Sequence, residues 1–193
     1  MNHVIRLATA TDSGEILNIY KPFIENTPIT FEITVPSVTE FSYRIESIIH
    51  QYPYLVYEID NTVVGYAYAS RHRKREAYCY DVDVSLYVLH EYHGSGVAHK
   101  LYGCLFKLLD ELGYINAYAS ITVPNEKSIK FHQKFGFTAI GTHHKTGYKL
   151  GQWHDVAWFE KAIRSHTERP NPIKMIGELS QAYLEDQFRL YII

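Results

Sequence analysis

The amino-acid sequence predicts an α/β (α+β) domain with a mixed central β-sheet flanked by helices and a C-terminal helical extension. Stretches that alternate apolar and polar residues, as strands do, are interleaved with stretches of helical spacing. The early strands are joined by a short turn and the later ones by helices, so both antiparallel and parallel pairs are expected. With 193 residues, 46% of them hydrophobic, the chain can bury one substantial core.

The N-terminal part predicts a strand, a helix and a loop. Residues 4–8 are expected to form the strand. Asp12 and Glu15 have the spacing of a capping box, which starts a helix. Pro22 should end or kink that helix, because proline lacks the N–H that a helix needs. Residues 26–35 then form a loop with an extended run.

A second helix and a hairpin are expected next. Ser37 and Glu40 form another capping box ahead of apolar residues at helical spacing. Residues 54–59 and 62–70 read as two strands. Asp60-Asn61 between them is a two-residue hairpin signal, so the two strands should pair antiparallel.

The middle of the chain combines a strand, a loop of small residues and a helix. Residues 81–88 alternate, with valine and leucine on one side. The loop contains Gly94, Gly96 and Ala98, and apolar residues at helical spacing follow it. Gly113 stands where a helix C-cap is expected.

Four further elements complete the predicted core. Residues 117–123 are expected to form a strand and residues 126–135 a short helix capped by Gly136. Phe137 opens a further strand, and residues 154–161 form the last strand of the core. Residues 142–153 predict a loop or a ragged hairpin.

The C-terminal residues form a predicted extension. Pro170 and Pro172 mark a linker, and residues 173–193 carry apolar side chains at helical spacing. We expect an amphipathic helix that docks on the core or on a second subunit. The chain is therefore divided into a domain at 1–162 and an extension at 163–193.

Composition excludes several classes of function. The net charge of -2 gives no electrostatic case for binding nucleic acid or an anionic membrane. The sequence lacks both an apolar run that could span a bilayer and a signal peptide, so a cytoplasmic protein is expected. Cys79 and Cys104 are interpreted as reduced thiols. The 11 histidines lack the spacing of metal ligands, so no metal is expected.

The glycine loop suits a phosphate group. A strand that enters a helix through small residues presents free N–H groups and the positive end of the helix dipole. The Gly-Lys-Ser/Thr of a P-loop is absent, and His99 stands where a dinucleotide fingerprint needs a small residue. The remaining pattern is His93-x-x-Gly96-x-Ala98. The alternative is a tight strand-to-helix turn without a ligand.

This pattern resembles the Gln/Arg-x-x-Gly-x-Gly/Ala loop of the GCN5-related N-acetyltransferase (GNAT) family, which holds the pyrophosphate of acetyl-CoA. Further segments resemble one branch of that family, the phosphinothricin and methionine sulfoximine N-acetyltransferases. These segments are Thr30-Phe31-Glu32, Tyr52-Pro53, Gly65-Tyr66-Ala67-Tyr68-Ala69, Arg75, Ala77-Tyr78, Pro124-Asn125, Gly147-Tyr148-Lys149 and Trp153-His154-Asp155-Val156. The resemblance implies the GNAT fold, acetyl-CoA as cofactor and a small amino-acid-like substrate, and we expect a homodimer.

The resemblance also implies a set of cofactor-binding residues. They lie on the central strand, in the glycine loop and at the start of the short helix: Ser85, Leu86, Tyr87, Val88, His93, Gly94, Ser95, Gly96, Val97, Ala98, Asn125 and Ser128. His93 replaces the Gln or Arg of the family, although its ring nitrogen can still donate. Asn125 has an alternative role as the cap of the short helix.

Three residues are candidates for the acid-base chemistry of acetyl transfer. Asp83 stands on the central strand where the family usually has Glu, and it could act as the base or could be an exposed strand residue. His154 could be the base, could orient the amine, or could be a strand-end histidine. His132 stands where many acetyltransferases have a tyrosine proposed to protonate the thiolate, and its alternative role is packing.

The resemblance places the substrate among Phe31, Glu32, Arg75, Tyr78 and Tyr148, with Arg75 on a carboxylate. Two other functions stay open at this point: acetylation of a protein or peptide amine, and a non-catalytic sensor that binds acyl-CoA.

Overall fold

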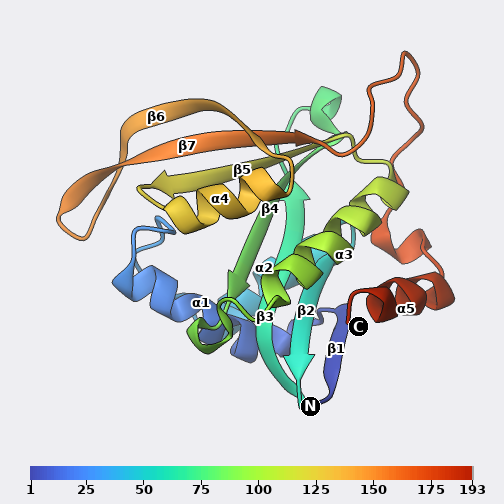
Figure 1. Ribbon diagram of the computed structural model, residues 1–193, viewed down its shortest axis with the longest axis horizontal. Coiled ribbons are helices and arrows are strands. Elements are labelled where there is room, and N and C mark those ends of the chain that lie inside the picture. The colour runs from blue at the N-terminus through green and yellow to red at the C-terminus, as the bar shows by residue number, and fades with distance from the viewer. Residues whose placement is uncertain (193) are drawn as a thin grey trace.

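The computed structural model describes residues 1–192, so Ile193 of the predicted C-terminal helix lies outside the described residues. One seven-stranded sheet forms the middle of the molecule, in the order β1-β2-β3-β4-β5-β7-β6 (Figure 1). Its strands are β1 (His3–Leu7), β2 (Tyr54–Ile59), β3 (Thr62–Arg71), β4 (Asp81–Val88), β5 (Asn116–Val123), β6 (Thr138–Lys149) and β7 (Gln152–Ala162). Only β4 and β5 pair in parallel, so the sheet is mixed as predicted.

Helices cover both faces of this sheet. The five α-helices are α1 (Ser13–Asn26), α2 (Val38–Ile49), α3 (Val97–Leu112), α4 (Glu126–Lys134) and α5 (Gln181–Leu190). The helices α1 and α2 share one hydrophobic cluster with β2 and β3. Side chains of α3, α4 and α5 belong to a second cluster on the opposite face (Figure 1). Successive residues of β2 and β3 contribute alternately to the two clusters, because neighbouring side chains of a strand point to opposite faces of the sheet.

Several local predictions are confirmed. Ser37 accepts a hydrogen bond from the Glu40 N–H and begins α2. Asp60 and Asn61 have φ values of 48° and 63°, as a tight hairpin turn requires. Gly113 ends α3 with φ 97°. Each of these signals acts between residues only a few positions apart.

The alternative that Pro22 ends α1 is wrong, and so is the side-chain cap predicted at Asp12. The helix does not end at Pro22 but continues to Asn26, because Ile24, beyond the proline, is buried against the sheet. Asp12 does not cap α1 with its side chain either. Its carboxylate instead binds the Arg6 guanidinium at 2.7 and 2.8 Å and the Thr9 N–H at 2.7 Å. A partly buried ion pair across two elements therefore replaces the predicted local cap.

For residues 142–153 the hairpin alternative holds. The strands β6 and β7 pair with two register shifts, and Leu150 and Gly151 turn with φ values of 51° and 80°. Most of β6 is exposed, so its sequence has no hydrophobic alternation to signal a strand.

The C-terminal extension is folded onto the core. The helix begins only at Gln181, where Ser180 accepts a hydrogen bond from the Tyr183 N–H, so the predicted start at residue 173 is wrong. The helix α5 lies against β1 and α3 (Figure 1). Tyr191 occupies the space beside Gly103 on α3, where a Cβ would lie 2.6 Å from its ring.

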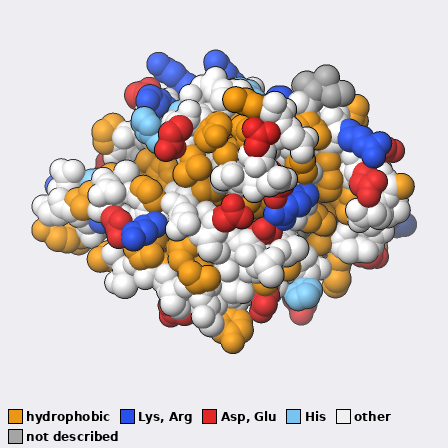
Figure 2. Space-filling view, turned by 90° about the horizontal axis from the view of Figure 1, so that it is seen from below, with side chains coloured by type: hydrophobic (Ala, Val, Ile, Leu, Met, Phe, Trp, Pro, Cys, Tyr) orange, Lys and Arg blue, Asp and Glu red, His pale blue; other side chains and the backbone are white. Residues whose placement is uncertain are grey.

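The surface carries charges of both signs. Figure 2 shows acidic and basic side chains interspersed among hydrophobic ones on the face seen from below. None of the helices within residues 1–192 combines the length and the apolar character that crossing a membrane requires.

Candidate active site

The site is built where β4 and β5 separate. These parallel neighbours pair only from Asp81–Asn116 to Asp83–Tyr118, and beyond that point they diverge. The Leu89 N–H donates to the Val64 carbonyl of β3 at 2.9 Å. Because successive N–H groups alternate along a strand, the Val88 N–H faces the opening instead. The central strand thus offers unpaired backbone groups to a ligand.

The glycine loop joins this opening to α3. Gly94 and Gly96 have φ values of +83° and +91°, a conformation that other residues adopt only with strain. Gly96 is the N-cap of α3 and brings no side chain to its first turn. The Val97 N–H makes only a long contact of 3.5 Å to the Ser95 hydroxyl, so the first N–H groups of α3 are available to an anion in the field of the helix dipole. The loop residues present fit a pyrophosphate group.

His93, at the start of the glycine loop, is hydrogen-bonded to the end of β4. Its Nε2–H donates to the Val88 carbonyl at 3.0 Å, and its ring lies beside that of His90. The imidazole thereby ties the end of β4 to the loop, and this nitrogen is engaged within the protein. Direct contact between His93 and a pyrophosphate stays a prediction.

A small cavity of about 80 Å³ lies in the opening between β4 and β5. Its lining includes Ser85, Leu86 and Tyr87 on one side and Asn125, Ser128 and His132 on the other. Asn125 caps α4, because its Oδ1 accepts from the Ser128 N–H at 3.2 Å. Its Nδ2 makes no hydrogen bond to a residue in the range 1–192, so this amide group is still available to a ligand.

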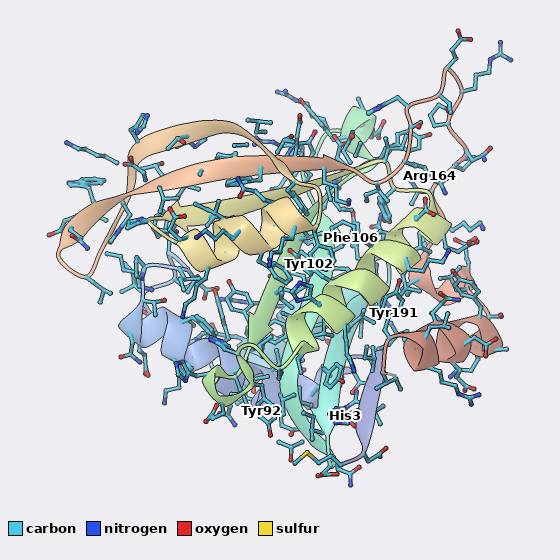
Figure 3. The ribbon with its side chains drawn as sticks, viewed as in Figure 1. His3, Tyr92, Tyr102, Phe106, Arg164 and Tyr191 are labelled. Atoms are coloured by element: carbon cyan, nitrogen blue, oxygen red, sulfur yellow. The ribbon has the colours of Figure 1, made fainter. Side chains whose placement is uncertain are left out.

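His132 is buried in this wall with both ring nitrogens engaged. Its Nδ1–H donates to the Ser128 carbonyl at 2.8 Å, and its Nε2 accepts from the Tyr102 hydroxyl at 3.0 Å. Figure 3 shows Tyr102 between α3 and α4. Burial lowers the pKa of His132, which therefore favours the neutral ring. The packing role and a role for the Tyr102–His132 pair both agree with this geometry.

A larger cavity of about 490 Å³ adjoins the first. Both cavities are lined by Ile29 and by five residues of β4 and β5, so they meet at the gap between these strands: Val84, Ser85, Tyr87, Ser120 and Thr122. Aromatic side chains line the larger one, among them Phe31, Tyr118 and Trp158. Asp83 and His143 are its titratable groups besides the tyrosines. This cavity suits a small molecule with an apolar portion and an amine.

Asp83 faces this cavity and is held from behind. The His72 Nδ1–H donates to Asp83 Oδ1 at 2.7 Å. Burial raises the pKa of Asp83, while the hydrogen bond from His72 lowers it, and the net direction is upward. A carboxylate with a raised pKa is a better proton acceptor than an exposed one.

Phe31 reaches the cavity because of a glycine on β6. A Cβ at Gly147 would overlap the Phe31 ring, so only glycine leaves room for it. The neighbouring Glu32 goes elsewhere. It binds the Arg44 guanidinium at 2.8 and 2.9 Å and lines a separate cavity beside α2. Glu32 therefore lies outside the lining of the Asp83 cavity, and its contact with a substrate stays a prediction.

Four other predicted residues lie outside the lining of the Asp83 cavity. Arg75 stands at the start of a short turn in the β3–β4 connection, and Tyr78 contacts the His72 ring edge-on. Tyr148 is exposed and lies on Trp153. The His154 ring is buried, and its Nε2–H donates to the Lys149 carbonyl at 3.0 Å, which braces the β6–β7 hairpin.

Sequence reasoning missed His72, Tyr118, His143, Trp158 and Tyr102. His72 stood in a run of basic residues that reads as a charged surface loop. The alternation of residues 116–123 places Tyr118 on one face of β5. The sequence does not tell which face of that strand borders the site, because this depends on how β5 pairs with its neighbours. His143 and Trp158 come from the hairpin whose pairing was left open.

Comparisons with known proteins agree with this geometry. The family model described as "Acetyltransferase (GNAT) domain" matches residues 5–158. Phosphinothricin N-acetyltransferase from Streptomyces viridochromogenes is 32% identical over 91% of this chain and 95% of its own length. L-methionine sulfoximine/L-methionine sulfone acetyltransferase from Salmonella typhimurium is 29% identical over 84% of this chain and 95% of its own.

A solved structure extends the match to three dimensions. The phosphinothricin acetyltransferase from Sinorhizobium meliloti, in complex with acetyl-CoA, superposes with a TM-score of 0.82 at 33% identity. The alignment covers 91% of this chain and 98% of that one. Together with the divergent β4 and β5 and the glycine loop, these matches show that the chain belongs to the GNAT family of acetyl-CoA-dependent N-acetyltransferases, in its phosphinothricin and methionine sulfoximine acetyltransferase branch.

Proposed function

We propose that this enzyme acetylates the amine of a free amino acid or a close analogue. One observation carries the proposal: the Asp83 carboxylate faces an aromatic cavity that meets a second cavity at the gap between β4 and β5. A small amine in the aromatic cavity would lie next to the Asp83 carboxylate as a base and next to the backbone of β4 where that strand separates from β5. Two relatives are named for phosphinothricin and methionine sulfoximine, which are compounds of this size and class.

The cofactor would be held on the α3 side of the sheet. The N–H groups at the start of α3, after the Gly94–Gly96 loop, suit its pyrophosphate, and Asn125 and Ser128 would contact its arm from α4. When bound, acetyl-CoA supplies the acetyl group as a thioester. The Val88 N–H is positioned to donate to the carbonyl oxygen on which charge develops.

Asp83 removes the proton from the substrate ammonium. The N–H bond breaks, its electron pair stays on nitrogen, and the proton passes to the carboxylate directly or through water. An α-amino group has a pKa of about 8, so roughly a tenth is already neutral near pH 7 and a weak base suffices. On the opposite side, the single Tyr102 O–H is donated to the Nε2 of the neutral His132 ring, so the departing thiolate can take its proton from water.

The substrate would be recognised by its two ends. Phe31, Tyr118 and Trp158 would enclose the side chain of the substrate. We assign the substrate carboxylate to Arg75. The loop that carries Arg75 also carries Tyr78, whose ring contacts His72 beside Asp83. Residues 1–162 carry these functions, and residues 163–193 form the extension. We also infer a homodimer.

The test compares amino acids with their carboxamides. Release of CoA is measured for phosphinothricin, methionine sulfoximine and other free amino acids, each beside its carboxamide and a short peptide. The enzyme should prefer the carboxylates, and Arg75→Ala should cost about ten- to a hundredfold in kcat/KM for the acids alone, because a bidentate contact is lost. Arg169→Ala, in the exposed linker, is the matched control.

Three outcomes would count against the proposal. Preference for peptide amines would indicate a protein or peptide acetyltransferase. Binding of acetyl-CoA without turnover of any amine would indicate a sensor. Equal kcat/KM values for amino acids and their carboxamides would show that Arg75 does not bind the substrate carboxylate.

A further inference from the structure

His72 is the most enclosed polar group next to the proposed base. Its side chain is 9% exposed, whereas that of Asp83 is 39% exposed. Antiparallel pairing aligns Ser70 of β3 with Asp83 of β4. His72 is the first residue after β3, which ends at Arg71, so it stays close to the Asp83 position on the neighbouring strand. A 2.7 Å hydrogen bond joins its Nδ1 to the Asp83 carboxylate.

Two further elements hold the imidazole in place. The Tyr118 ring of β5 stacks on it with centroids 4.2 Å apart and an angle of 18° between the planes. The Tyr78 ring meets it edge-on, with centroids 6.2 Å apart. An imidazole held between two aromatic rings keeps its orientation, and its Nδ1 stays directed at Asp83. Since β5 and the β3–β4 connection both contribute, this arrangement is built by the fold.

We propose that His72 is a positioning residue for acetyl transfer, which fixes one oxygen of the Asp83 carboxylate so that the other faces the amine. This inference rests on the proposed role of Asp83 as the base. A short aspartate side chain on a strand can rotate, and rotation would turn its oxygens away from the substrate. A donor on Oδ1 leaves Oδ2 for the proton. His72 itself touches no reacting atom in this scheme.

The charges around Asp83 determine the sign of the pH effect. Burial and the nearby Asp81 raise the pKa of Asp83, and His72 and Arg73 lower it. Two tyrosines also lie near this carboxylate: Tyr118, whose ring stacks on His72, and Tyr68 of β3. Loss of the His72 donor leaves Arg73 as the only one of these groups that lowers the pKa, so the pKa of Asp83 should rise. Activity that needs the ionised carboxylate should then be lost at a higher pH as the medium is acidified.

The experiment replaces His72 in three ways and measures kcat, KM and the pH profile of kcat/KM. His72→Phe keeps a ring beside Tyr118 and removes the donor. His72→Asn places an amide N–H where Nδ1 was, because both are bonded to Cγ, whereas His72→Gln displaces the donor by one bond. His3→Phe is the matched control, since His3 also hydrogen-bonds, to Tyr57 at 3.1 Å, but on β1 at the far edge of the sheet (Figure 3).

His72→Phe should lower kcat about tenfold at pH 7 with little change in KM, and should move the acidic limb of the profile upward by about one pH unit. His72→Asn should retain most of the parent kcat and most of the parent pH profile, and His72→Gln should retain less of each. Parent-like kcat and pH profile in His72→Phe would overturn the inference. Equal losses in all three variants would also overturn it, as would an unshifted limb. Should His72→Phe fail to fold, the comparison of Asn with Gln decides.

Asp83→Asn separates this inference from the proposed function. If that variant matches the parent at every pH, Asp83 is not the base and the proposed mechanism fails. If it loses turnover near neutrality and partly recovers at higher pH, where more amine is neutral, the base is confirmed. A parent-like His72→Phe beside such an Asp83→Asn would remove the role of His72 alone.

Discussion

At the scale of single residues, the backbone at Gly96 has the most direct link to function. Its φ of +91° orients the N-terminal amides of α3, yet a Cβ there would meet nothing within 4 Å. The need for glycine is therefore conformational, and crowding is not the cause. Placing any other residue at this positive φ costs about 1 kcal/mol of conformational free energy or forces the loop into another conformation.

Gly96→Val should therefore weaken acetyl-CoA binding by at least tenfold while the fold persists, as measured by calorimetric titration and thermal unfolding. Gly14→Val is the matched control, because Gly14 also has open space around its Cβ position but no positive φ. Unchanged affinity in Gly96→Val would show that the cofactor does not use this loop.

At the scale of elements, the β6–β7 hairpin shapes the substrate cavity. Its strands contribute His143, Thr146, Val156 and Trp158 to the lining. The hairpin is braced by His154 through the Lys149 carbonyl and by the bond from the Lys145 N–H to Asp155 at 2.7 Å. A change on this hairpin should therefore alter substrate binding and leave the cofactor side unaffected.

Gly147→Ala should displace the Phe31 ring, because the new methyl group would occupy its place. We expect KM for the amino-acid substrate to rise at least severalfold, with the affinity for acetyl-CoA unchanged. Gly141→Ala, on the same strand and with nothing within 4 Å of its Cβ position, should behave like the parent. The same KM in both variants would exclude Phe31 from the substrate wall.

At the scale of the whole molecule, the C-terminal extension completes the core. Ile176, Leu184 and Phe188 are buried in the same cluster as the leucines of α3. Backbone bonds add to this: the Lys174 N–H donates to the Leu112 carbonyl at 2.9 Å, and the Ile176 N–H to the Gln51 carbonyl at 3.3 Å. The extension should therefore unfold together with the domain.

Leu184→Ala tests this docking. Leu184 is 5% exposed and Leu190, on the same helix, is 65% exposed. The first substitution should lower the free energy of unfolding by about 2–5 kcal/mol, and Leu190→Ala should stay within about 0.5 kcal/mol of the parent. Denaturant titration measures both, and light scattering on the same samples reports whether the inferred dimer persists. Equal small effects would mean that α5 is only loosely attached.

The sequence by itself determined the features that depend on residues close together in the chain. The Ser37–Glu40 capping box, the Asp60-Asn61 turn, the Gly113 cap and the loop at Gly94–Ala98 all act within a few residues, so their patterns could be read directly. The order of these elements, with the family resemblance, was enough to predict the GNAT fold and its cofactor loop.

Only the tertiary structure decided which side chains share the site. It paired His72 with Asp83 through the β3–β4 register, directed Glu32 to Arg44, and opened a place for Phe31 beside Gly147. These contacts join residues 11 to 116 positions apart in the sequence (83 − 72 = 11; 147 − 31 = 116). Such distances depend on strand register and on how packed layers meet, and a slip of one residue turns every side chain of a strand to the other face.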